Sequence, residues 1–313
     1  MPDVTCLGEL LIDFTSLQPG ASIIETPGFE KHAGGAPANV AVAVSRLGGS
    51  AAFLGMVGDD EFGCYLAKML ADRAVDITGL RYSADAHTTL AFVALRADGE
   101  REFIFYRNPG ADMLYGPADL DDALVAGGRV FHHGSISLIS DANRAATLRA
   151  IGLARQRGAL ISYDPNLRLN LWESPGAARA GIALGLPTAD LLKISEEELA
   201  FITGETELDA GMALLRARGI PAVIVTLGAE GCAYSWGACT GRVPGVKVEQ
   251  VDATGAGDAF VAAVLYRLTR RTPVILTLPQ AEIEEILAFA NKVAAIVVTR
   301  RGAIPAMPAL GEI

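Results

Sequence analysis

The sequence has little of what marks secreted, metal-stapled or membrane proteins. Its four cysteines, at positions 6, 64, 232 and 239, lack the spacing of a metal site. Cys232 and Cys239 could face each other across a hairpin, but reduced, buried thiols suit a cytoplasmic protein better. The first residues carry no basic, apolar signal segment, and charged or polar residues interrupt every apolar stretch before the ~18 residues of a membrane span. We therefore expect a cytoplasmic protein that does not contact a membrane.

Aromatic residues and net positive charge are also scarce. Phe, Trp and Tyr make up 6% of the 313 residues, which argues against an aromatic-rich β-sandwich. The formal net charge of −10 argues against nucleic acid as a partner, because binding to a phosphate backbone needs a basic surface. The sequence is rich in apolar residues, at 51%, and in glycine, with 34 residues. This composition indicates a folded globular chain with many tight turns.

Strand-length apolar runs alternate with amphipathic, helix-length segments along most of the chain. Such alternation predicts βαβ crossovers and a mostly parallel sheet with helices on both faces. In that architecture ligands bind at the carboxyl ends of the strands. The predicted strands cover 4–8, 51–57, 130–133, 160–164, 191–194 and 222–227, and the predicted helices cover 39–47, 61–73, 142–157, 196–203, 209–218, 258–268 and 280–298.

Two segments interrupt this alternation. Residues 15–32 are punctuated by Pro and Gly and have no helical period. Residues 88–109 predict two strands, 89–95 and 102–106, joined by a turn over 97–100. Both segments are too short to be domains. We expect them to form a small β-sheet lid inserted into the larger part; the alternative is a pair of decorated loops.

The segment from Asp252 to Phe260 gives the most specific indication of a reactive site. It reads Asp-Ala-Thr-Gly-Ala-Gly-Asp-Ala-Phe and leads into a helix. Gly255 and Gly257 allow the backbone to present successive N–H groups, and the helix N-terminus adds its positive dipole end, so the segment predicts an anion hole. Asp258 would stand at that hole as a base for a hydroxyl nucleophile. The alternative is a glycine turn with a helix-capping acid.

A second glycine-rich segment precedes an earlier helix. Gly34 and Gly35 come just before Pro37 and Asn39, so backbone can approach a ligand closely there, and the Asn39 amide can bind sugar hydroxyls. Alone, this segment would be an ordinary helix start. The sequence contains neither G-x-x-x-x-G-K-[ST] nor, after the first strand, G-x-G-x-x-G, which excludes a P-loop kinase and a standard dinucleotide site.

Together these two segments resemble the signatures of the ribokinase-like (PfkB) carbohydrate kinase family, and the resemblance extends over nearly the whole chain. It implies one domain, residues 1–313, with a three-layer α/β/α fold around a mostly parallel, Rossmann-like sheet. The lid would be formed by residues 15–32 and 88–109, and the rest would be the nucleotide-binding part. Relatives commonly form homodimers through this lid, so we expect one here.

The resemblance also implies roles for individual residues. Asp258 would be the catalytic base, and the backbone of Gly255, Ala256 and Gly257 would hold the phosphoryl group being transferred. The implied sugar-binding residues are Asp13, Gly34, Gly35, Asn39, Arg107 and Arg168. The implied ATP-binding residues are Ser195, Glu198, Thr226, Gly228, Gly257 and Asn291.

Two metal ions are implied as well. Glu198 lies where the family's N-x-x-E motif acts on Mg²⁺ indirectly, with Ser195 in place of the asparagine. Ser195 and Glu198 also make a good helix-capping box. A K⁺ site would use Asp252 with the carbonyls of Thr254, Val297, Arg300 and Gly302. Ala306 stands where some relatives have a serine.

Several stretches most resemble fructokinases, among them residues 8–14, 102–109, 131–137 and 163–169. We therefore predict an ATP-dependent kinase that converts D-fructose to D-fructose 6-phosphate. Asp164 to Arg168 also resembles a D-x-N-x-R motif of 2-keto-3-deoxygluconate kinases, where Arg168 or Arg107 could meet an acidic sugar. The same fold would also suit a ribose kinase, a nucleoside kinase, or a sugar- or nucleotide-binding sensor without turnover. The adjacent His132 and His133 would point to opposite faces of a strand, which favours a structural role over a metal site.

Overall fold

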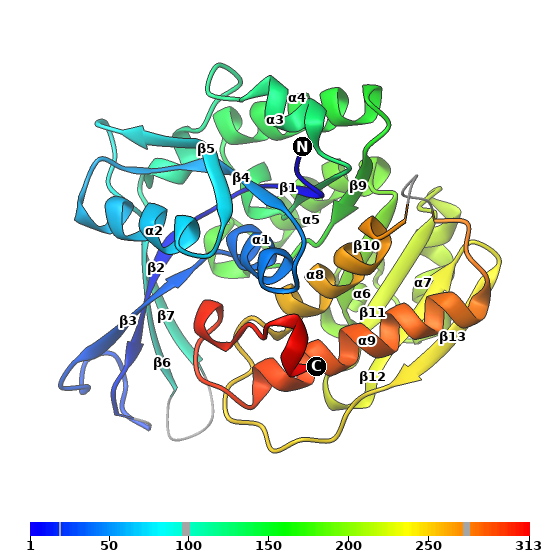
Figure 1. Cartoon of the computed structure of the whole chain (residues 1–313). Coiled ribbons are helices and arrows are strands. Elements are labelled where there is room, and N and C mark those ends of the chain that lie inside the picture. The colour runs from blue at the N-terminus through cyan, green and yellow to red at the C-terminus, as the bar shows by residue number, and fades with distance from the viewer. Residues whose placement is uncertain (19, 96–100, 272–275) are drawn as a thin grey trace.

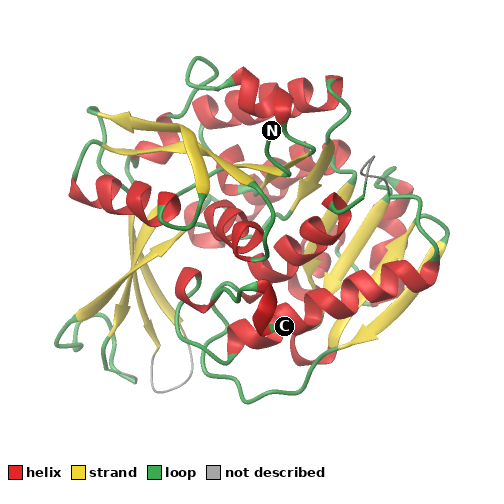
Figure 2. Ribbon diagram, viewed as in Figure 1, coloured by secondary structure: helices red, strands yellow, loops and turns green. Residues whose placement is uncertain are grey.

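Two β-sheets of different size organise the chain (Figures 1 and 2). The computed structural model describes residues 1–18, 20–95, 101–271 and 276–313. Within these residues the larger sheet has nine strands in the order β13-β12-β11-β10-β9-β8-β1-β4-β5. They are β1 (Val4–Leu7), β4 (Ala51–Gly58), β5 (Val75–Ser83), β8 (Val130–His133), β9 (Leu160–Tyr163), β10 (Leu191–Ser195), β11 (Ala222–Thr226), β12 (Gly231–Trp236) and β13 (Cys239–Pro244).

Every strand pair between β5 and β11 in this order is parallel, as the alternating pattern predicts. The two pairs at the other edge, β11–β12 and β12–β13, are antiparallel. Parallel strands are buried on both faces, which explains why β1, β4, β8 and β9 consist of buried residues throughout. Because these strands run the same way, their carboxyl ends meet at one edge of the sheet.

Helices cover both faces of this sheet. Neighbouring strand residues alternate between two layers of core, so that Leu191 packs with one and Leu192 with the other. On the first face lie α1 (Ala36–Arg46), α2 (Glu61–Ala71), α8 (Ala256–Thr269) and α9 (Gln280–Val298). On the second lie α3 (Asp122–Gly127), α4 (Asp141–Gln156), α5 (Pro175–Gly185), α6 (Glu196–Thr203) and α7 (Leu208–Ala217). The fold is therefore the predicted three-layer α/β/α arrangement.

The smaller sheet projects from the larger part of the molecule, at the lower left in Figure 1. Its described strands are ordered β3-β2-β6-β7, with β2 (Leu11–Ser16), β3 (Phe29–Gly34), β6 (Leu90–Leu95) and β7 (Arg101–Tyr106). The strands span residues 11–34 and 90–106, so the sheet begins before the predicted 15–32 segment. The predicted turn at 97–100 lies outside the described residues.

Several elements were not predicted. They include β5, α3, α5 and the short 3₁₀ helices, and the α8 helix begins two residues before its predicted start. The described 3₁₀ helices are Ala111–Leu114, Ile136–Leu138, Leu169–Leu171, Leu186–Thr188, Gly228–Glu230, Ile304–Ala306 and Leu310–Glu312.

The structure shows the state of the four cysteines. All four cysteines are free, and Cys239 pairs in register with Trp236 rather than with Cys232. Cys64 is exposed, so the expectation of buried thiols is wrong at that position.

His132 and His133 are both buried, and burial lowers the pKa of each to about 3, which keeps the rings neutral. His132 Nδ1 lies 3.0 Å from Ser162 Oγ, and His133 stacks on Tyr163.

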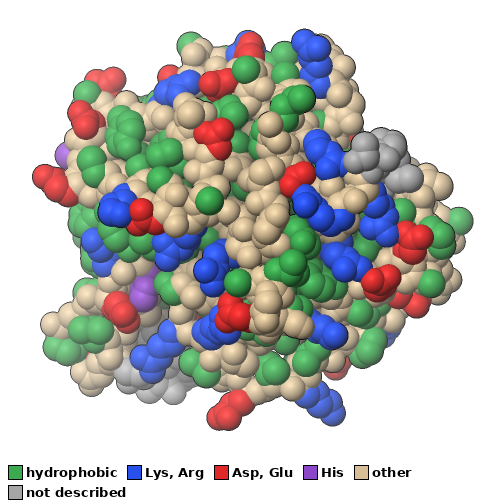
Figure 3. Space-filling model, viewed as in Figure 1, with side chains coloured by type: hydrophobic (Ala, Val, Ile, Leu, Met, Phe, Trp, Pro, Cys, Tyr) green, Lys and Arg blue, Asp and Glu red, His purple; other side chains and the backbone are tan. Residues whose placement is uncertain are grey.

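The surface carries charges of both signs. On the face shown in Figure 3, Lys and Arg side chains are interspersed with Asp and Glu. Each helix of the described chain is too short or too polar to cross a lipid bilayer.

Candidate active site

Polar and charged side chains gather where the parallel strands of the larger sheet end. Asp164 follows β9 directly, and Lys193 and Ser195 lie in the last residues of β10. Thr226 ends the neighbouring strand β11, in register with Ser195. The start of α8 belongs to the same region, since a Cβ on Gly257 would lie 2.9 Å from Lys193 Nζ. The structure therefore assembles a site at the edge where this architecture binds ligands.

The amino end of α8 is built to expose its backbone. Gly255 caps the helix with φ +80°, and a Cβ there would lie 2.8 Å from the Ala303 Cβ, so only glycine fits. Among the described residues, the N–H groups of Gly255 and Gly257 have no protein acceptor, whereas Ala256 N–H donates to Ala253 O at 3.3 Å. First-turn amides without intrahelical partners, at the positive end of a helix, favour a bound anion.

Asp258 lies in this first turn of α8, and a residue of α1 holds its carboxylate by a hydrogen bond. Its Oδ2 accepts a hydrogen bond of 2.7 Å from Asn39 Nδ2 on α1, although the two residues are far apart in sequence. Burial raises the pKa of Asp258 to about 6, against the lowering effect of Asn39, Lys193 and Arg168. A carboxylate with this pKa is ionised at neutral pH and still able to take up a proton, as a general base requires.

Asp13, on β2 of the smaller sheet, faces the same region. Burial raises the pKa of Asp13 to about 7, Arg168 lowers it and the Asp258 carboxylate raises it. A Cβ on Gly34 would lie 2.1 Å from Asp13 Oδ2, so the glycine gives this carboxylate its room. Gly35, with φ +110°, caps α1 and leaves no space for a side chain against Glu9 O. Four of the predicted sugar-binding residues, Asp13, Gly34, Gly35 and Asn39, thus lie around Asp258.

The two predicted substrate arginines differ. Arg168 is exposed and acts electrostatically on both Asp13 and Asp258. Arg107 is buried in an ion pair with Asp112, with Nη2 and Nε at 2.7 and 2.9 Å from Oδ2. This ion pair engages the Arg107 guanidinium within the protein and so competes with a substrate role for it. A role for either arginine in sugar binding stays a prediction.

The predicted nucleotide-side residues make contacts within the protein. Ser195 and Glu198 form the capping box of α6, and Glu198 Oε1 also accepts from Leu167 N at 2.6 Å. Asn291 Nδ2 donates to the carbonyls of Val243 and Pro244 at 3.2 and 3.1 Å, which ties α9 to the end of β13. Their contacts with a nucleotide, and those of Thr226 and Gly228 beyond β11, stay predictions.

The predicted cation-binding residues meet beside the anion hole. Asp252 Oδ1 accepts from Thr254 N and Oγ1, and Oδ2 accepts from Gly302 N at 2.9 Å. The carbonyl of Val297 accepts from Arg300 N at 3.0 Å. The loop is adjacent to the hole because Ala303 touches the position where a Gly255 side chain would lie.

Sequence reasoning missed two residues in this region. Lys193 forms a buried ion pair with Asp164, and Glu9 accepts a 2.8 Å hydrogen bond from Ala36 N at the start of α1. Burial raises the pKa of Glu9 to about 7. A signal was present for Lys193, because it is a lone charge within the apolar run Leu191 to Ile194.

The chain is similar to known carbohydrate kinases over nearly its whole length. Residues 1–310 match the model of the pfkB family carbohydrate kinases. The chain is 51% identical over 312 residues to fructokinase-1 of Oryza sativa subsp. japonica, which covers 99% of this chain and 96% of that relative.

Two solved structures share the whole fold. The fructokinase of Xylella fastidiosa with bound ATP superposes with a TM-score of 0.91 at 36% identity, covering 100% of this chain and 97% of that chain. A double mutant of the fructokinase of Vibrio cholerae O395, bound to fructose, ADP and a potassium ion, gives 0.87 at 34% identity, with coverage of 100% and 97%.

Proposed function

Because the chain belongs to the pfkB family of carbohydrate kinases, we propose that it transfers the γ-phosphoryl group of ATP to D-fructose. The products are D-fructose 6-phosphate and ADP. The observation that carries this proposal is the position of Asp258, which is buried and hydrogen-bonded to Asn39 beside the Gly255 and Gly257 amides, which have no partner among the described residues. Fructose as the acceptor is supported by the fructokinases to which the chain is similar.

The geometry supports direct transfer with Asp258 as the base. The Asp258 carboxylate accepts the proton of the sugar hydroxyl while that oxygen forms its bond to the γ-phosphorus. The bond from the γ-phosphorus to the bridging oxygen breaks, and ADP leaves with the electron pair. Asn39 fixes Oδ2 of the carboxylate, so the base is oriented before the substrate binds. The amides of Gly255 and Gly257 stabilise the charge on the transferred group.

ATP would enter on the side of Ser195, Glu198, Thr226, Gly228 and Asn291. Its phosphates bring Mg²⁺, which neutralises their charge when bound. Glu198 fits an indirect role, because its two oxygens already accept backbone hydrogen bonds in the capping box and from Leu167. Mg²⁺ typically keeps several waters and uses one or two carboxylates together with substrate phosphates, which suits such a site.

A monovalent cation fits the loop that carries Asp252. This carboxylate is held by Thr254 and Gly302, and it lies in the loop whose Ala303 contacts the Gly255 position. A K⁺ ion coordinated by Asp252 with carbonyls of Thr254, Val297, Arg300 and Gly302 would add positive charge beside the anion hole. The potassium ion bound by the Vibrio cholerae protein supports this assignment.

The smaller sheet would act as a lid over the sugar and as a dimer interface. It carries Asp13, and its strand β7 exposes Ile104 and Tyr106, which are 42% and 64% exposed. Exposed apolar groups on a projecting sheet favour pairing with a second copy.

The four free thiols are consistent with a reducing cytoplasmic compartment.

Acceptor-dependent ADP release tests the function. We expect rapid turnover of MgATP with D-fructose in the presence of K⁺, and far slower turnover with D-ribose, adenosine or 2-keto-3-deoxygluconate. Turnover with the acid sugar alone would keep the mechanism and assign Arg168 to carboxylate recognition. Folded protein that is inactive with every acceptor would contradict the proposal.

A further inference from the structure

A buried ion pair lies beside the anion hole and has no part in the mechanism above. Lys193 Nζ donates to Asp164 Oδ2 at 2.9 Å, and the two side chains are only 8% and 4% exposed. Asp164 stands at the end of β9 and Lys193 near the end of β10. The pair therefore occupies the carboxyl edge of the sheet, next to the start of α8.

Stability is a poor explanation for this pair. Removing two charges from water costs several kcal/mol per ion, and well-packed apolar residues are often as stable in such a position. Leu191, Leu192 and Ile194 of the same strand are apolar and fully buried. The second oxygen of Asp164, Oδ1, is buried and has no hydrogen-bond partner among the described residues. A pair retained only for packing would be expected to have all its polar atoms satisfied.

The ammonium group is directed at the amino end of α8. A Cβ built on Gly257 would lie 2.9 Å from Lys193 Nζ and 3.8 Å from its Cε, so the absence of a side chain at Gly257 makes room for the ammonium. Within the described chain Nζ makes one hydrogen bond, to Asp164, and an ammonium group has three donors. Two N–H donors therefore remain beside the Gly257 amide, which also lacks a partner within the described part of the chain.

We propose that Lys193 is a catalytic residue that donates to the phosphoryl group during its transfer, and that Asp164 is the positioning residue that aims its ammonium. This inference rests on the proposed kinase function. The backbone amides of the hole carry only partial charge, whereas the ammonium supplies a full positive charge as negative charge moves toward ADP. The Asp164 carboxylate and Glu198 keep Lys193 charged: burial lowers its pKa, but these neighbours raise it above the usual value.

The first test is Lys193→Met, which removes the ammonium and ends where Lys Cε stood. We expect kcat to fall about 100-fold, as on loss of one donor to a developing charge, and KM for fructose to stay within about threefold. Lys68→Met removes a lysine from an exposed pair with Asp72 and should leave kcat unchanged. A folded Lys193→Met protein with near-normal kcat would overturn the proposal.

A second variant tests the position of the ammonium without removing it. Gly257→Ala places a methyl group against Nζ, the movable end of a flexible side chain. We expect about a tenfold loss of kcat in the wild-type background and less than a twofold further loss in Lys193→Met, because the methyl then meets no ammonium. If Gly257→Ala instead lowers kcat by the same factor in both backgrounds, it acts on the anion hole independently of Lys193. That result would overturn the proposal.

The pH profile tests whether the pair acts electrostatically on the Asp258 base, as its position requires. The groups that face Asp258 are Asn39, Asp13, Asp164, Lys193 and Arg168. Lys193 lowers the pKa of Asp258 and Asp164 raises it. The acidic limb of kcat/KM should therefore move to higher pH in Lys193→Met and to lower pH in Asp164→Asn. If the acidic limb of the kcat/KM profile moves in neither variant, the ion pair only supports the fold.

Nucleotide binding provides a readout that needs neither sugar nor turnover. By calorimetry with MgATP and MgADP, we expect Lys193→Met to weaken ATP about tenfold and to change ADP less than twofold, because only ATP carries the group to be transferred. Equal weakening of both nucleotides would overturn the assignment. Inactivity of the wild type with fructose would contradict the proposed acceptor while leaving this comparison valid.

Discussion

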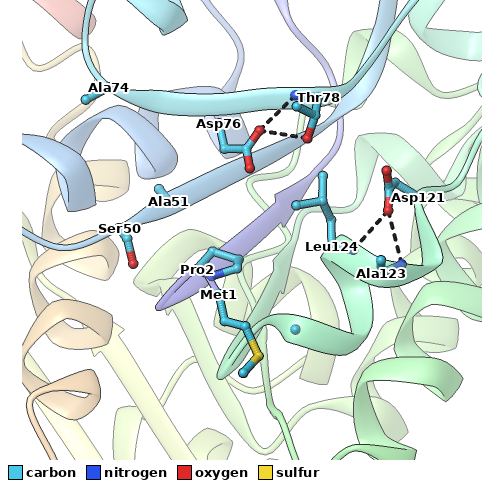
Figure 4. Close-up of a pocket in the computed structure, with 11 residues that line it drawn as sticks. Met1, Pro2, Ser50, Ala51, Ala74, Asp76, Thr78, Asp121, Ala123 and Leu124 are labelled. Carbon is cyan, nitrogen blue, oxygen red and sulfur yellow. Dashed lines mark hydrogen bonds between the residues drawn. The ribbon is translucent and has the colours of Figure 1, made fainter.

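A pocket at the amino edge of the larger sheet and the site at its carboxyl edge hold their acids in different ways. At the amino edge, a surface pocket of about 440 Å³ lies between the start of the chain, the beginnings of β4 and β5, and α3 (Figure 4). Its acids are satisfied locally: Asp76 accepts from Thr78 N and Oγ1, and Asp121 accepts from Ala123 N and Leu124 N. At the carboxyl edge, Asp258 and Asp164 interact with residues from distant parts of the chain.

This difference supports placing the proposed active site at the carboxyl edge. An acid that caps its own turn has used its hydrogen-bonding capacity to stabilise local structure. Buried acids with raised pKa values, beside amides that have no partner in the described chain, leave capacity for a ligand at a cost in stability.

The largest effect is expected for Asp258→Asn. The amide keeps the shape of the carboxylate and can accept from Asn39, but it cannot take up the proton of the sugar hydroxyl. We expect kcat to fall by about 10³-fold or more, the upper range for loss of a general base, with the fold intact. Initial rates and circular dichroism check this. Near-normal turnover would remove Asp258 as the base.

A smaller loss is expected for Gly255→Ala. The new methyl would lie 2.8 Å from the Ala303 Cβ and meets a backbone with φ +80°, so the anion hole must shift. We expect kcat to fall about 100-fold. Gly48→Ala is the matched control, since Gly48 has φ +87° and open space around its Cβ position. The control should lose about 1–2 kcal/mol of stability and no activity; equal loss of kcat in both variants would contradict the prediction.

The buried acids also predict how stability depends on pH. Asp258 has a folded pKa of about 6, above the 3.8 of an exposed aspartate. Its protonated side chain therefore contributes fully to the free energy of unfolding below about pH 4, and this contribution is lost as pH rises through 6 and the buried carboxyl group ionises. The two-unit shift corresponds to up to ~3 kcal/mol. Asp258→Asn should therefore melt at a higher temperature than the wild type at pH 7.5 and at a similar temperature at pH 4. Equal melting temperatures at both pH values would show that the Asp258 charge carries no such cost.

The smallest effect is expected at the amino edge. Asp121→Ala removes the N-cap of α3 and should cost about 1 kcal/mol of stability. Its kcat should equal that of the wild type, because the pocket at this edge has no part in the reaction. A fall in kcat without a change in stability would give this pocket a functional role and weaken the contrast between the edges.

Much of the fold follows from local sequence patterns. The apolar runs that became β1, β8 and β9, and the amphipathic segments that became α6 and α9, have boundaries within a residue of those predicted. β5 was missed because its burial alternates irregularly with exposed positions, so it has neither a continuous apolar run nor a strict two-residue period. The 3₁₀ helices are too short to have any period.

The sequence by itself determined the family, the parallel sheet and the glycine-rich start of α8, because each depends on residues that are close together along the chain. Only the tertiary structure decided which side chains meet: Asn39 with Asp258, Asp13 with Gly34, and Lys193 with Asp164. It also gave Arg107 a buried partner, whereas the capping box of Ser195 and Glu198 is local and was predicted from the sequence. Long-range contacts, and the desolvation that raises the pKa of Asp258, arise only when packing brings distant segments together and excludes water.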